Sequence, residues 1–177
     1  HPYVVMLLDD SLSMSIKDRY REDLDLGRVA GAIGREAEQL REQPASRAEI
    51  VEALLSRQEG KLLKEVAAKG QLKILTFSNT VKLREARPMA KPGAGQAQPE
   101  GREVPLERGE PIPPLVPAGP GTNMAKGLRE ALKALAGQPV AGIVLVTDGQ
   151  NTEGDDPLNA ADYAARQSVP IFTVGIG

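Results

Sequence analysis

The sequence contains no cysteine, no tryptophan and a single histidine, His1, to which no role is assigned. Without cysteine the chain has no disulfides, thiolate metal sites or cysteine nucleophile, and its compartment stays open. Aromatic residues make up 3% of the chain and are too scattered to form a stacking platform for nucleic-acid bases. Lysine and arginine (22) nearly balance aspartate and glutamate (24). The resulting net charge of −2 excludes a strong field that would attract nucleic acid or an anionic membrane.

Long apolar runs are also missing. None approaches the roughly 20 residues that span a bilayer, and no signal peptide is visible, so we expect no direct membrane insertion by this fragment. The length of 177 residues fits one domain, residues 1–177. Because the sequence starts at His1 rather than methionine and stops on a strand-like segment, we expect it to be part of a longer protein.

Short apolar runs alternate with segments of helical periodicity. The runs predict strands that are buried on both faces, with a further edge strand at Val81–Leu83. The predicted strands are Pro2–Leu8, Leu72–Phe77, Ile143–Thr147 and Ile171–Ile176. The predicted helical segments are Leu26–Leu40, Ser46–Lys69 with a capping box at its start, Met124–Leu135, and Pro157–Ala165 capped by Asp155 or Asp156. This alternation predicts an α/β fold with a mainly parallel sheet.

The segment Arg87–Gly121 interrupts the pattern. It holds nine of the 14 prolines, which excludes a regular helix or a central strand. A loop of this length inside a compact domain is either functional or poorly ordered. Because it leads directly into Thr122, we expect it to shape the rim of a binding site.

Three polar groups follow strands or open a helix. They are Asp9-Asp10-Ser11-Leu12-Ser13, Gly121-Thr122-Asn123 and Thr147-Asp148-Gly149. Ligands of parallel sheets bind beyond the carboxyl ends of the strands, so these groups could converge there. The side-chain atoms of these groups that could bind a metal are oxygens, apart from one asparagine amide nitrogen, and none belongs to histidine or cysteine. Such a set suits a hard cation such as Mg²⁺, Mn²⁺ or Ca²⁺ and disfavours zinc or copper.

Each group also has a simpler interpretation. Ser11, Ser13 or Thr122 alone is most typical of a helix N-cap, and Asp148-Gly149 alone is typical of a turn. Together these interpretations require three coincidences at three matching element ends, which favours the shared site. Asp10 fits a solvated acid as well as a functional one.

These residues resemble a known family. Asp9-x-Ser11-x-Ser13 followed by Met14, with Thr122 in "GPGTNMAKGL" and Asp148 in "IVLVTDGQNT", resembles the metal-ion-dependent adhesion site (MIDAS) of von Willebrand factor A domains. The ending "VPIFTVGIG" is similar to the last sheet strand of bacterial members, and the sequence style resembles membrane-anchored ones.

The resemblance implies a doubly wound, Rossmann-like fold and a protein-interaction module. In such a site the hydroxyls of Ser11, Ser13 and Thr122 bind the cation directly, and Asp9 and Asp148 act through water and hydrogen bonds. A carboxylate from a partner protein then becomes a further ligand. The family usually has one helix between the first two strands, so we expect Ser46–Lys69 to be an additional helix. The usual helix after the final strand is absent.

Two other functions stay open. Asp9 after a first strand also resembles the nucleophile of haloacid-dehalogenase-type phosphoryl-transfer enzymes, but Ser11 stands where their general acid is expected. A response-regulator receiver fits poorly too, because "LKILTF" ends in Ser78 rather than an aspartate. Alternatively, the metal could only brace the fold. We expect a binding module and not an enzyme.

Overall fold

The computed structural model describes residues 1–84 and 114–177. Residues 87–113 of the predicted proline-rich segment therefore lie outside the described residues. The strands are β1 (Tyr3–Asp9), β2 (Gln71–Phe77), β3 (Val81–Arg84), β4 (Val140–Thr147) and β5 (Ile171–Gly175). The helices are the 3₁₀ turn η1 (Leu12–Ser15), α1 (Asp23–Ile33), α2 (Ala37–Glu42), α3 (Arg47–Lys69), α4 (Met124–Lys133) and α5 (Pro157–Arg166).

The strands form one mixed sheet in the order β3-β2-β1-β4-β5. β1 lies at its centre and pairs in parallel with β2 and β4, so Asp9 ends beside Phe77 and Leu8 beside Val146. β5 adds in parallel to β4, and only β3 is antiparallel, as a hairpin partner of β2. The predicted mainly parallel α/β sheet with an edge strand at Val81–Leu83 is confirmed.

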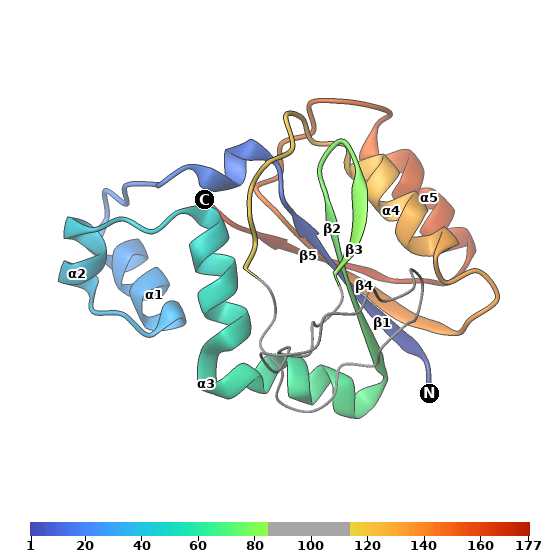
Figure 1. Ribbon diagram of the computed structural model, residues 1–177, viewed down its shortest axis with the longest axis horizontal. Coiled ribbons are helices and arrows are strands. Elements are labelled where there is room, and N and C mark those ends of the chain that lie inside the picture. Colours follow the sequence, from blue (N-terminus) through green and yellow to red (C-terminus); the bar gives the residue numbers. More distant parts are fainter. Residues whose placement is uncertain (85–113) are drawn as a thin grey trace, which may run out of the picture.

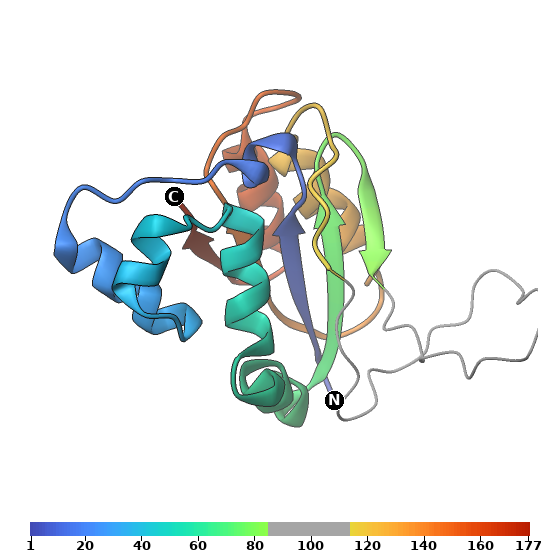
Figure 2. The ribbon, with the colours of Figure 1, turned by 60° about the vertical axis from the view of Figure 1, so that its left-hand side comes forward.

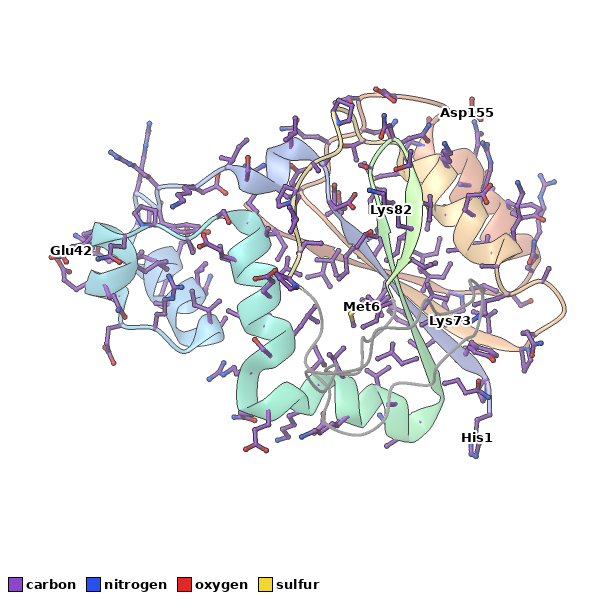
Figure 3. The ribbon with its side chains drawn as sticks, viewed as in Figure 1. His1, Met6, Glu42, Lys73, Lys82 and Asp155 are labelled. Atoms are coloured by element: carbon purple, nitrogen blue, oxygen red, sulfur yellow. The ribbon has the colours of Figure 1, made fainter. Side chains whose placement is uncertain are left out.

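Helices cover both faces of this sheet (Figure 1). α4 and α5 pack on one face, where Leu128 and Ala160 join Phe77 and Ile143 in the largest apolar cluster. α3 packs on the other face, where Val51 contacts the cluster around Met6, which Figure 3 labels on β1. The sheet is therefore enclosed between two helical layers.

α1 and α2 lie outside these layers, on the far side of α3 from the sheet (Figures 1 and 2). They pack on α3 through a third cluster of apolar side chains. The predicted single stripe Leu26–Leu40 is wrong, because Gly34 adopts a left-handed conformation (φ 71°) and ends α1. The predicted helix Ser46–Lys69 corresponds to α3, which covers the sheet, whereas α1 and α2 lie outside it.

The predicted caps explain where two helices begin. Ser46 Oγ accepts from Glu49 N (3.2 Å) and Glu49 Oε2 accepts from Ser46 N (2.6 Å), which confirms the capping box of α3. Asp156 rather than Asp155 caps α5, by accepting from Leu158 N. Within the described ranges no helix has both the length and the apolar character needed to cross a bilayer.

Candidate metal centre

Three loops meet at the carboxyl ends of β1 and β4. Gly119 is bound to the loop after β1, since its N–H donates to Asp10 O (3.2 Å) and its carbonyl accepts from Leu12 N (2.8 Å). Thr122 O accepts from the N–H groups of Thr152 and Glu153, both at 3.0 Å, in the loop after β4. Backbone bonds therefore bring together the three predicted polar groups.

Gly119 is required where the middle loop crosses the end of β2. A Cβ atom at this position would lie 2.1 Å from the Cβ and Oγ atoms of Ser78, far inside a real contact. Any side chain would push this loop away from the other two. This close approach has no signature in the local sequence beyond the glycine itself.

Asp9 is the centre of the cluster and is fully buried. Its Oδ1 accepts from Ser11 N (2.9 Å) and Ser11 Oγ (2.6 Å), and its Oδ2 accepts from Thr147 Oγ1 (2.7 Å). Ser11 Oγ and Ser13 Oγ lie 3.0 Å apart and share a hydrogen bond. Burial raises the pKa of the Asp9 carboxyl, the hydrogen bonds from Ser11 and Thr147 oppose this rise, and the negative charge of Asp148 adds to it.

The simpler interpretation of the hydroxyls as helix caps is wrong for two residues. Ser11 precedes η1 but makes no side-chain capping bond, because its hydroxyl is directed to Asp9. Thr122 does not cap α4, since Asn123 Oδ1 does so by accepting from Lys126 N (2.8 Å). Thr122 is 2% exposed and is held by its backbone, with its N–H donating to Thr152 Oγ1 (2.8 Å).

Asp148 follows β4, and both of its oxygens accept hydrogen bonds. Oδ1 accepts from Gln150 N (3.1 Å), which confirms a local turn, and Oδ2 accepts from Arg47 Nη1 (2.9 Å). Arg47 also donates from Nε and Nη2 to both oxygens of Asp18. The Arg47 side chain is 13% exposed.

Sequence analysis missed Arg47 and the role of Thr147. One signal pointed to the arginine: it directly follows the N-cap of α3, where the helix dipole disfavours a cation. A cation at that position suggests an acidic partner from elsewhere in the fold. Thr147 was named only as a member of the third polar group, without a role of its own.

The donor set fits a hard divalent cation. It offers three predicted hydroxyls and two carboxylates, which are the oxygen ligands that hard divalent cations prefer. In the part of the chain that the structure describes, no three His, Cys, Asp or Glu side chains gather as a metal cage. His1 lies at the opposite end of the sheet (Figure 3). Asp10, 7% exposed, has a buried Oδ1 for which the described residues provide no hydrogen-bond partner.

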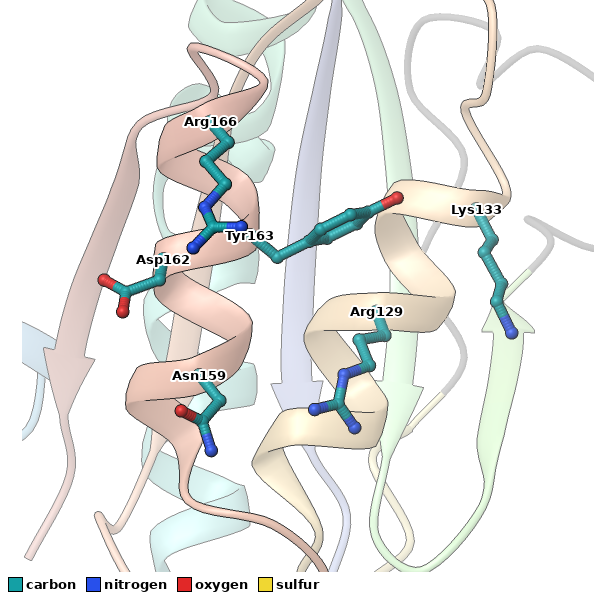
Figure 4. A pocket seen from close by; sticks show the side chains of 6 residues that line it. All are labelled: Arg129, Lys133, Asn159, Asp162, Tyr163 and Arg166. Atoms are coloured by element: carbon teal, nitrogen blue, oxygen red, sulfur yellow. The ribbon is translucent and has the colours of Figure 1, made fainter.

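A cavity of about 330 Å³ between α4 and α5 is a separate feature (Figure 4). Two of its basic side chains are already paired, Arg129 with Asp155 (2.7 Å) and Lys133 with Glu130 (2.9 Å). All four of these side chains are substantially exposed. This cavity therefore lacks the burial of the cluster around Asp9.

Comparison with known proteins agrees with this fold. The family model of the von Willebrand factor type A domain matches residues 112–177. This part of the chain, from the loop before α4 to β5, is therefore similar to a von Willebrand factor type A (VWA) domain. Two crystal forms of proximal thread matrix protein 1 from the mussel byssus share the fold, with TM-scores of 0.51 and 0.52 and 18% identity. They cover 98% of this chain, which spans 37% of theirs.

A further structure of that mussel protein, with a TM-score of 0.50 and 18% identity, has a zinc-occupied MIDAS motif. No curated protein matches the chain. The VWA recognition and the Rossmann-like fold are thus confirmed. In the structure, the five predicted site residues lie at the end of β1 or on the three loops that meet there.

Proposed function

We propose that this VWA domain is a protein-interaction module that holds a divalent cation and binds an acidic group of a partner protein. The hydrogen-bonded cluster Asp9-Ser11-Ser13, buried at the end of the central strand, carries the proposal. Ser11, Ser13 and Thr122 would bind the cation through their hydroxyls. Asp9 and Asp148 would orient those ligands and balance the charge.

The choice of neutral hydroxyls explains why a partner would be needed. Serine and threonine ligands leave most of the positive charge on the cation, whereas a cage of carboxylates would neutralise it. Mg²⁺ requires octahedral oxygen coordination and keeps exchangeable positions, so a carboxylate from outside can enter. Mg²⁺ is the proposed ion, with Mn²⁺ and Ca²⁺ as alternatives, and the zinc in the mussel protein makes zinc worth testing.

The geometry of Asp9 favours binding over phosphoryl transfer. A nucleophilic carboxylate needs an oxygen that can reach a substrate, yet both oxygens of Asp9 accept hydrogen bonds from Ser11 and Thr147. The residue is also fully buried. We further propose that the domain belongs to a longer, membrane-anchored bacterial protein, on the resemblance of its sequence.

Isothermal titration of metal-stripped protein with Mg²⁺, Mn²⁺, Ca²⁺ and Zn²⁺ tests the proposal. We expect one saturable site, weakened about tenfold or more in Ser13→Ala and in Thr122→Val, because each variant removes one oxygen ligand. Ser15→Ala is the matched control: it removes an exposed hydroxyl of the same turn, whose only bond is to Leu12 O (2.7 Å).

The second step of the test uses a carboxylate. Acidic peptides should bind the cation-loaded domain and lose binding with chelator or in Ser13→Ala. Absence of cation binding by folded wild-type protein, or equal losses in Ser15→Ala and Ser13→Ala, would contradict the proposal. Turnover of a phosphoester in the presence of Mg²⁺ would favour the enzyme instead.

A further inference from the structure

Arg47 lies between two acids from different parts of the chain. Its guanidinium binds Asp18 through two hydrogen bonds, from Nε (2.7 Å) and Nη2 (2.9 Å). Its remaining nitrogen, Nη1, donates to Asp148 Oδ2 at 2.9 Å. Asp18 precedes α1, Arg47 begins α3, and Asp148 belongs to the proposed metal centre.

These ion pairs are shielded from solvent and held in place. The side chains are 13% exposed at Arg47, 23% at Asp18 and 1% at Asp148, so water screens them less than a surface pair. Arg47 N donates to Ile16 O (3.0 Å), which fixes the start of α3 beside η1. Gly177 lies against the guanidinium of Arg47, since a Cβ atom at position 177 would be 2.8 Å from Arg47 Nε.

From this geometry we infer that Arg47 sets the cation affinity of the metal centre, an inference that rests on the proposed function. The guanidinium and a bound cation would both be attracted by the negative charge of Asp148, so each weakens the attraction available to the other. Arg47 therefore weakens cation binding, and it leaves the bound cation more positive toward a carboxylate of the partner. Asp18 has the opposite effect, because it neutralises part of the charge of Arg47.

Two substitutions separate this effect from a purely structural one. Arg47→Met removes the positive charge at similar size and should tighten Mg²⁺ binding by roughly tenfold or more, because it removes the repulsion between a unit charge and a divalent cation. Asp18→Asn frees the charge of Arg47 and should weaken Mg²⁺ binding by roughly threefold. Loss of structural support alone would move both variants in the same direction.

Three controls complete the titration series. Arg47→Lys keeps the charge and should stay within about threefold of wild type. Arg41→Met and Asp23→Asn make the same charge changes in an exposed ion pair that joins α1 to α2, away from the centre, and should leave the affinity unchanged. The rise in melting temperature from chelator to Mg²⁺ should be larger for Arg47→Met than for wild type, because in this variant Asp148 Oδ2 no longer has the arginine as its partner.

The outcomes distinguish the inference from the function on which it rests. Cation binding by wild type with equal or weaker binding by Arg47→Met would overturn the inference alone. If Arg47→Met does not fold, Asp18→Asn decides: weaker binding with an unchanged melting temperature in chelator supports the inference, and unchanged or tighter binding overturns it. No cation binding by folded wild type would overturn both.

Discussion

At the scale of single residues, the burial of Asp9 carries a stability penalty. Its carboxylate is fully buried beside Asp148, and burial raises its pKa above the ordinary value of 3.8. Above 3.8 the folded state therefore holds a proton more readily than the unfolded state does. In metal-free protein, stability should fall as pH rises through this range, because ionising Asp9 is harder in the folded state.

Asp9→Asn should consequently stabilise the metal-free domain at neutral pH while abolishing cation binding. Asparagine can keep the bonds to Ser11 and Thr147, because their hydroxyls can reverse direction. We expect a gain of about 1 kcal/mol, typical of removing a strained functional group. Melting of metal-stripped protein across acidic to neutral pH measures it. The gain should grow with pH, and a loss of stability at neutral pH would contradict the argument.

The five proposed site residues could be identified from the sequence because each stands near the end of an apolar run or the start of a helix. It could not place Arg47, since the bonds of a long side chain across 101 positions leave no local periodic trace. Nor could it show that Ser11 donates to Asp9 instead of capping η1. Such contacts depend on how the loops meet in space.

At the scale of elements, α3 contains a break that the periodic spacing of its apolar residues does not reveal. Gln58, Glu59 and Gly60 have φ values of 51°, 57° and 73°, which are left-handed, so the helix consists of two segments. Apolar spacing on both sides of the break is regular, and the sequence pattern therefore predicted one helix, Ser46–Lys69. Side-chain periodicity reports which face is buried and not whether the backbone between the turns is continuous.

Gly60→Ala and Gly31→Ala should change stability in opposite directions. An alanine at position 60 must adopt a left-handed φ of 73°, which destabilises by about 1 kcal/mol. Gly31 lies in regular α1 with nothing within 4 Å of an added Cβ, so alanine there should stabilise by about 0.5–1 kcal/mol. Urea unfolding of both variants measures this, and stabilisation by Gly60→Ala would mean that α3 is continuous.

At the scale of the whole molecule, the apolar core and the metal centre are separate. The three clusters of buried apolar residues come mainly from helices and strands, while the hydroxyls of the proposed centre lie in η1 or on loops at one end of the sheet. The core is therefore expected to hold the fold together without metal. This distinguishes an interaction module from a scaffold that its metal braces.

Metal-stripped domain should accordingly remain folded and melt cooperatively. Mg²⁺ at a hundred times its dissociation constant adds about 2.7 kcal/mol, which for a chain of this size corresponds to a rise of roughly 5–10 °C in the melting temperature. Calorimetry with and without chelator measures both quantities, with Ser13→Ala as the variant that should lose most of the rise. A stripped protein that lacks a cooperative transition would instead show that the cation braces the fold, because the loops around Asp9 could not close without it.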